Sequence, residues 1–115
     1  MVGFGEINVL CTDLERSLGF YRDALGLEEL EREAGAVRLR LGPITVLLLP
    51  IAASTRKADR YGSESGISFD VVVPDVDAAI EALEAAGGQR IDVIDDGAGW
   101  AVADPDGTII EVIGG

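Results

Sequence analysis

The sequence predicts a single α+β domain built from two βαβββ modules, and three observations lead to this prediction. The order strand, helix, three strands occurs twice along the 115 residues. Each expected helix follows an aspartate suited to the N-cap position, and these two residues, Asp13 and Asp75, lie 62 residues apart. With 48% hydrophobic residues, a chain of this length can form one core. A duplication on this scale indicates that the two halves share a fold.

Module one is expected to comprise residues 1–51. Its first strand is residues 6–11, where apolar and other side chains alternate. After the helix come a charged segment, 27–33, a strand at 37–41 and, beyond a Gly-Pro turn, 44–49 as the third post-helix strand. Between the first strand and the charged segment, a helix is predicted from an apolar stripe that ends before Gly26: Leu14, Leu18, Tyr21 and Leu25.

Residues 52–66 are interpreted as an exposed, mobile linker, and module two as residues 67–115. In module two a strand at 67–73 precedes the helix that Asp75 caps, and two glycines end this helix. Three more strands are expected at 90–94, 100–103 and 108–113. Before the last strand, Asp104-Pro-Asp-Gly is a strong turn signal, and we expect Asp104 and Asp106 to form this turn rather than to bind a ligand.

The charge of the chain disfavours some partners. Nine Lys and Arg against 21 Asp and Glu give a formal net charge of −12, which repels nucleic acid and anionic membranes and attracts cations. An acidic surface that serves only solubility is the alternative. The single cysteine, Cys11, is typical of a reducing compartment, and the residue pattern predicts neither a signal peptide nor a membrane-spanning helix. We therefore expect a cytoplasmic protein.

The chain contains no histidine. This excludes a Ser-His-Asp triad, an imidazole zinc site and a two-histidine iron site. Any metal ion would depend on carboxylates, carbonyls, hydroxyls or water, which suit magnesium, calcium or manganese. The sequence predicts no resident metal and no other cofactor.

Three segments carry a resemblance to the vicinal oxygen chelate superfamily, the group of glyoxalase I, bleomycin-resistance proteins and extradiol dioxygenases. They are residues 13–27 (DLERSLGFYRDALGL), 73–80 (VPDVDAAI) and 104–111 (DPDGTIIE). The resemblance spans nearly the whole chain. It implies that the two modules form a curved eight-stranded mixed sheet around a cleft, with the helices outside.

Metal-dependent members of this superfamily carry ligands at four positions, and the resemblance places these at Glu6, Val46, Ser68 and Glu111. In a different register Leu48 takes the place of Val46, and neither side chain can bind a metal. Two carboxylates and a hydroxyl, with Asp70 nearby, make a poor site that could hold only a hard ion weakly. We expect glyoxalase and dioxygenase chemistry, which needs the metal as a Lewis acid, to be absent.

The alternation of side chains along the strands predicts which residues face the cleft. The two arginines of the strand 37–41 are interpreted as facing the cleft. The alternatives are that they neutralise nearby carboxylates or lie exposed. Trp100 is interpreted as a stacking surface for a ligand ring, and its alternatives are ordinary packing or a subunit contact. The predicted ligand-binding residues are Glu6, Asn8, Arg38, Arg40, Ser68, Asp70, Trp100 and Glu111.

The favoured function is that of a non-catalytic protein of the bleomycin-resistance type, which sequesters a cationic or aromatic small molecule. We expect a homodimer, because strand edges need cover. The alternative is a glyoxalase-like lyase or isomerase. In it, Glu6 or Glu111 has a raised pKa and transfers a proton, with or without a weakly held divalent metal. A regulatory domain without a ligand is a third possibility.

Overall fold

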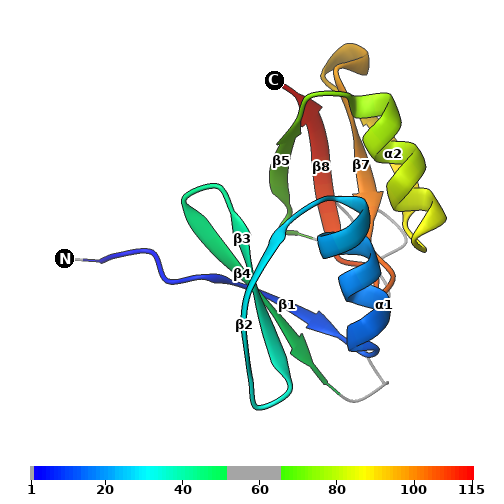
Figure 1. Cartoon of the computed structure of the whole chain (residues 1–115). Coiled ribbons are helices and arrows are strands. Elements are labelled where there is room, and N and C mark those ends of the chain that lie inside the picture. The colour runs from blue at the N-terminus through cyan, green and yellow to red at the C-terminus, as the bar shows by residue number, and fades with distance from the viewer. Residues whose placement is uncertain (1, 52–65) are drawn as a thin grey trace.

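The computed structural model describes residues 2–51 and 66–115, so residues 52–65 of the expected linker lie outside the described residues (Figure 1). It confirms the α+β fold class with two βαβββ modules. Module one contains β1 (Ile7–Cys11), α1 (Leu14–Leu18), η1 (Gly19–Ala24), β2 (Glu28–Glu33), β3 (Ala36–Leu41) and β4 (Ile44–Pro50). Module two contains β5 (Phe69–Val73), α2 (Val76–Ala85), β6 (Gln89–Ile94), the short turn η2 (Asp95–Gly97), β7 (Gly99–Ala103) and β8 (Ile109–Gly114). None of the helices in the described ranges is long and apolar enough to cross a membrane.

The two modules have the same sheet topology. The strand orders are β1-β4-β3-β2 and β5-β8-β7-β6. In each sheet the first strand pairs in parallel with the last strand of its module, and the other pairs are antiparallel. Within the described residues, the eight predicted strands therefore divide into two hydrogen-bonded sheets of four strands, each with one face covered by helices (Figure 1).

Both predicted helix caps are confirmed. The Asp13 side chain accepts a hydrogen bond from the backbone N–H of Arg16 at 3.2 Å, and the Asp75 side chain accepts one from Ala78 at 3.1 Å. These bonds satisfy N–H groups that the first helical turn leaves unpaired. The first helix continues from α1 into the π-helical segment η1, and it ends before Gly26, which has a φ of 92°.

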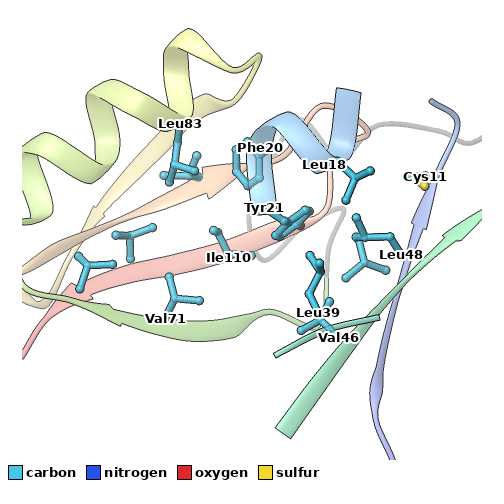
Figure 2. Packing of buried hydrophobic residues seen from close by; sticks show 14 of the residues in the cluster. Cys11, Leu18, Phe20, Tyr21, Leu39, Val46, Leu48, Val71, Leu83 and Ile110 are labelled. Carbon is cyan, nitrogen blue, oxygen red and sulfur yellow. The ribbon is translucent and has the colours of Figure 1, made fainter. Parts of the chain in front are cut away.

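The core lies between the helices and the helix-facing side of both sheets. Phe20 and Tyr21 of η1 are fully buried, and their rings pack edge to face with centroids 4.8 Å apart. Figure 2 shows this part of the first helix between side chains of both modules. On one side lie Leu39, Val46 and Leu48 of the first sheet, and on the other lie Val71, Leu83 and Ile110 of module two. One continuous core therefore joins the modules, and within the described residues no helix covers the opposite face of either sheet.

A polar contact also joins the modules. The predicted turn at Asp104–Gly107 is confirmed, with the backbone N–H of Asp104 bonded to the carbonyl of Thr108 at 2.8 Å. From this turn the Asp106 carboxylate accepts hydrogen bonds from the backbone N–H (3.0 Å) and the hydroxyl (2.5 Å) of Thr12 in module one. Asp106 thus holds the end of β1 against the last turn of module two.

Candidate functional site

The predicted cleft residues lie mainly on the open faces of the two sheets. On the first sheet, strand register places Arg38 beside Leu47, and Leu47 is paired in turn with Asn8 of β1. On the second sheet, Asp70 of β5 is paired with Glu111 of β8. The side chains in each group point away from the helices, because neighbouring residues in a strand alternate between its two faces. The structure therefore offers two polar centres, one on each module.

The polar centre of module one is an ion pair between Glu6 and Arg38. Nε of Arg38 lies 2.8 Å from Oε1 of Glu6, and Nη2 lies 3.1 Å from Oε2. The Thr45 hydroxyl donates to the same carboxylate at 3.4 Å, and Nη1 of Arg38 contacts Glu31 at 2.6 Å. The Arg38 guanidinium holds the pKa of Glu6 below its ordinary value. The hypothesis that Glu6 is a base with a raised pKa is therefore wrong.

Arg40 lies at the rim of the same face, where its Nε contacts Glu28 at 3.0 Å. Both side chains are more than half exposed. Arg38 and Arg40 therefore neutralise carboxylates, which is one of the two alternatives considered for them. Neither guanidinium is left as an unpaired binding site for an anion.

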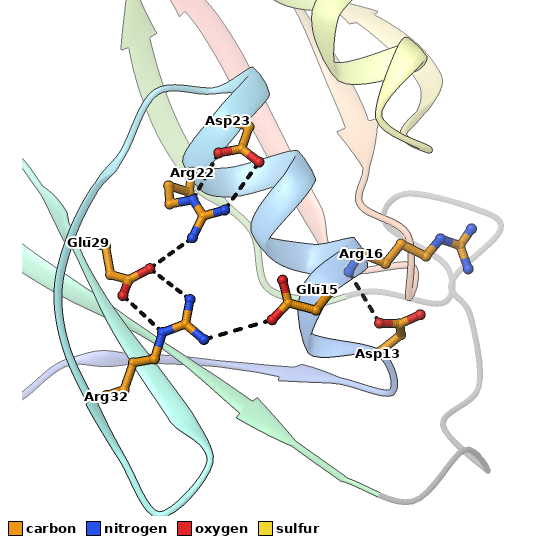
Figure 3. Close-up of polar contacts among 7 residues, drawn as sticks. All are labelled: Asp13, Glu15, Arg16, Arg22, Asp23, Glu29 and Arg32. Atoms are coloured by element: carbon orange, nitrogen blue, oxygen red, sulfur yellow. Dashed lines mark hydrogen bonds and ion pairs between the residues drawn. The ribbon is translucent and has the colours of Figure 1, made fainter.

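A second set of ion pairs ties the first helix to β2 (Figure 3). The Glu29 carboxylate accepts from Arg22 at 2.9 Å and from Arg32 at 2.9 Å, and Arg32 also lies 3.7 Å from Glu15. The two guanidiniums lower the pKa of Glu29 to about 2. Of the arginines within residues 2–51 and 66–115, only Arg16 makes no ion pair. In the described part of the chain, positive charge is thus largely neutralised while acidic groups remain in excess.

The polar centre of module two brings Ser68 and Glu111 together. The Ser68 hydroxyl donates to Oε2 of Glu111 at 3.1 Å, and both side chains are half-buried. Asp70 is exposed on the neighbouring strand. Ser68, Asp70 and Glu111 thus lie on one face of the second sheet, as expected.

The module-one counterpart of Glu111 is Leu47. It is not Val46 or Leu48, the two residues expected there. Leu47 pairs with Asn8 as Glu111 pairs with Asp70, and both Val46 and Leu48 are fully buried on the helix side. The predicted position is wrong because it was found by counting residues from the glycine of the preceding turn. The turn before β4 is shorter than the turn before β8, so the same count reaches a different place in the strand. Leu47 also has no donor atom, so the ligand set still lacks one member.

Trp100 lies on the opposite face of the second sheet from Glu111. Its cross-strand partner is Val112, whereas the partner of Glu111 is Ala101. The Arg90 guanidinium stacks 4.6 Å from the centre of the Trp100 ring and contacts Glu84 of α2. The structure therefore does not bring Trp100 to the residues proposed for the cleft.

Hollows lined by described residues open on these faces. One of about 250 Å³ lies on the first sheet, and its lining includes Glu31, Glu33, Ala36, Arg38, Leu47 and Leu49. Another, of about 350 Å³, lies between the β3–β4 turn and β5 and is lined by Leu41, Gly42, Pro43, Ile44, Asp70 and Val72. Of these lining residues, only Arg38 and Asp70 belong to the predicted ligand-binding set. Alternation along residues 44–49 could have placed Leu47 and Leu49 beside Arg38, but nothing in the sequence brings the turn to β5.

The residues present do not fit the metal centre of the superfamily. In the ranges 2–51 and 66–115, no three residues among His, Cys, Asp and Glu are grouped so as to hold a metal ion. Glu6 is already bound by a guanidinium, and Leu47 offers only hydrocarbon. Transition metals need several strong donors in a fixed geometry.

Comparisons with known proteins agree with this fold. The family model of the glyoxalase-like domain matches residues 6–113. A glyoxalase-related enzyme from Fulvimarina pelagi has a TM-score of 0.77 at 23% identity, covering 100% of this chain and 89% of that one. The trypanothione-dependent glyoxalase I of Leishmania major has a TM-score of 0.72 at 23% identity, with 95% and 84% covered. The fosfomycin resistance protein FosX of Listeria monocytogenes has a TM-score of 0.72 at 16% identity, with 100% and 94% covered. No curated protein matches the chain in sequence.

Proposed function

The chain belongs to the glyoxalase-like domain family of the vicinal oxygen chelate superfamily, and from this premise we propose that it binds and sequesters a cationic or aromatic small molecule without transforming it. One observation carries the proposal. At the first metal-ligand position, Glu6 is held by both nitrogens of the Arg38 fork, 2.8 and 3.1 Å away. Such a paired carboxylate is a weak ligand, because a metal ion would have to displace a neighbouring cation.

The charge distribution supports a cationic ligand. The chain carries a net charge of −12, and Arg38 and Arg40 on the open face are paired with carboxylates. The open faces combine apolar side chains with a few polar groups, as small-molecule sites do. The ligand-binding set that we propose is Glu6, Asn8, Arg38, Arg40, Ser68, Asp70 and Glu111.

The assembly and location that we propose follow from the same features. A second copy of the chain would cover exposed edge strands such as β1, on which Asn8 and Leu10 are exposed. Cys11 is buried and forms no disulfide, in keeping with the proposed cytoplasmic location. Light scattering of the purified chain distinguishes a dimer from a monomer.

Proton transfer by Glu111 is the competing function, and the hydrogen bond from Ser68 favours it. A half-buried carboxylate that accepts a hydrogen bond from a neighbouring side chain has the form of a general base, and it would serve a lyase or isomerase. Glu6 does not fit this function, because Arg38 keeps its pKa low.

Calorimetry and an activity assay separate the two functions. The protein is treated with a chelator and titrated with metal-free bleomycin, a cationic aromatic probe. Turnover is assayed with the hemithioacetal of methylglyoxal and glutathione, with and without divalent ions. We expect chelator-insensitive binding that weakens with salt, and no product. Product formation that is lost in Glu111→Gln and kept in Asp92→Asn, an exposed carboxylate on β6, would establish the enzyme instead.

A further inference from the structure

A hollow lies between the two modules, with a wall from each. The β3–β4 turn contributes Leu41, Pro43 and Ile44, and β5 contributes Val72 and Asp70. The hollow has a volume of about 350 Å³, within the range of roughly 300–1,000 Å³ for small-molecule pockets. Val72 is 65% exposed. The hollow therefore presents apolar surface to a molecule from solution.

Among the described residues that line this hollow, Asp70 is the charged one. Its side chain is exposed, and throughout residues 2–51 and 66–115 no hydrogen bond or ion pair engages its carboxylate. The local field in and around the hollow is thus negative and favours a cation.

The hollow on the first sheet suits a cation less well. Its lining includes Arg38, whose guanidinium already contacts Glu31 at 2.6 Å. A second cation there would face a fixed positive charge and compete for a carboxylate that is already paired. Among the described residues that line the hollow between the modules, none is basic.

We infer that the hollow between the β3–β4 turn and β5 binds a monovalent organic ammonium ion, with the cation at Asp70 and the apolar body against Leu41, Ile44 and Val72. This inference rests on the proposed binding function and specifies its ligand class and location. A divalent metal is a poor occupant, because one carboxylate supplies too few oxygen ligands.

NMR titration of the full chain with phenethylammonium tests the inference, with 2-phenylethanol as a neutral probe of nearly the same shape. We expect phenethylammonium to shift the backbone amides of Gly42, Ile44, Asp70 and Val72. The alcohol should shift the same amides but bind about fivefold more weakly, because an exposed ion pair contributes up to about that factor.

Three variants assign the contacts. Asp70→Asn should weaken phenethylammonium binding by about fivefold and leave 2-phenylethanol binding unchanged. Asp92→Asn removes the same charge from an exposed position on β6 and should change neither affinity. Val72→Ala removes apolar surface from an exposed side chain and should weaken both probes.

The outcomes distinguish this inference from the proposed function. Amide shifts confined to residues 31–38 and 47–49 would place the cation in the other hollow and overturn the inference, with sequestration intact. Bleomycin binding without any phenethylammonium binding would do the same. Equal losses in Asp70→Asn and Asp92→Asn would show only general charge attraction and overturn the assignment to Asp70. Product formation without binding of either cation would overturn both.

Discussion

The Tyr21 hydroxyl donates a hydrogen bond to Oδ2 of Asp104 at 2.7 Å, and this contact joins the first helix to the last turn of module two. Oδ1 of Asp104 accepts from the backbone N–H groups of Asp106 and Thr108 at 2.8 and 2.9 Å. Tyr21 is fully buried and Asp104 is 3% exposed. The carboxylate is thus bonded by donors from both modules, as a buried charge requires.

Tyr21→Phe should destabilise the protein by about 1–3 kcal/mol, because it leaves a buried acceptor without its donor. The ring and its contact with Phe20 remain, so the change isolates the hydroxyl. Urea unfolding measures the effect, and we expect a lower midpoint with an unchanged slope. An unchanged midpoint would show that water replaces the hydroxyl and that the contact is energetically neutral.

Burial raises the pKa of Asp104 above its ordinary value, although the bonds from Tyr21 and from the turn act in the opposite direction. The folded protein therefore binds this proton more tightly than the unfolded chain does. The contribution of Asp104 to stability should grow as pH falls from above its raised pKa toward the ordinary aspartate value, and it should shrink as pH rises. An NMR titration of the Asp104 side-chain carbon measures this pKa, and a midpoint at or below the ordinary value contradicts the prediction.

Arg38→Gln should raise the pKa of Glu6 toward its ordinary value, because the guanidinium that lowers it is removed. In the unchanged protein, the ion pair with Arg38 stabilises the fold fully at pH values above the ordinary glutamate pKa. This stabilisation is lost as the pH falls through the lowered pKa that Glu6 has in the folded state. The variant should lose this acid-dependent contribution. Titration of the Glu6 side-chain carbon gives the direct measurement.

Arg40→Gln is the matched control for that variant. It removes the same charge from the same strand and face, but Arg40 pairs with Glu28 and not with Glu6. The pKa of Glu6 should therefore stay low in Arg40→Gln. A similar rise in both variants would show that Glu6 responds to the total charge of the face instead of to one ion pair.

The fold could be predicted largely from the sequence because local signals agreed. The caps Asp13 and Asp75, the alternating strands and the glycine stops each determine an element over a few neighbouring residues. The π-helical segment η1 was missed, because its apolar stripe also fits an ordinary helix. How the two four-stranded sheets pack against each other depends on contacts between the modules, such as that of Asp106 with Thr12, and no local signal gives these contacts.

The candidate site was less predictable, because alternation tells which residues share a face but not which side chains meet. Glu6 and Arg38 were placed on one face, yet their ion pair spans 32 residues of sequence. Trp100 is among the predicted ligand-binding residues, whereas its cross-strand pairing with Val112 puts its side chain on the opposite face. Strand register decides such cases, and a one-residue change moves a side chain to the other face, as at Leu47.

Removing divalent metal ions should leave the protein unchanged. We expect the melting temperature to be the same with and without EDTA, and added zinc, nickel or magnesium to give no rise beyond that produced by salt. The physical reason is the donor set, since Glu6 is held by Arg38 and Leu47 has no ligand atom. A specific site would raise the melting temperature with metal concentration according to its dissociation constant. If such a rise occurred and disappeared in both Glu6→Gln and Glu111→Gln, the two carboxylates would share a metal centre and sequestration without chemistry would have to be abandoned.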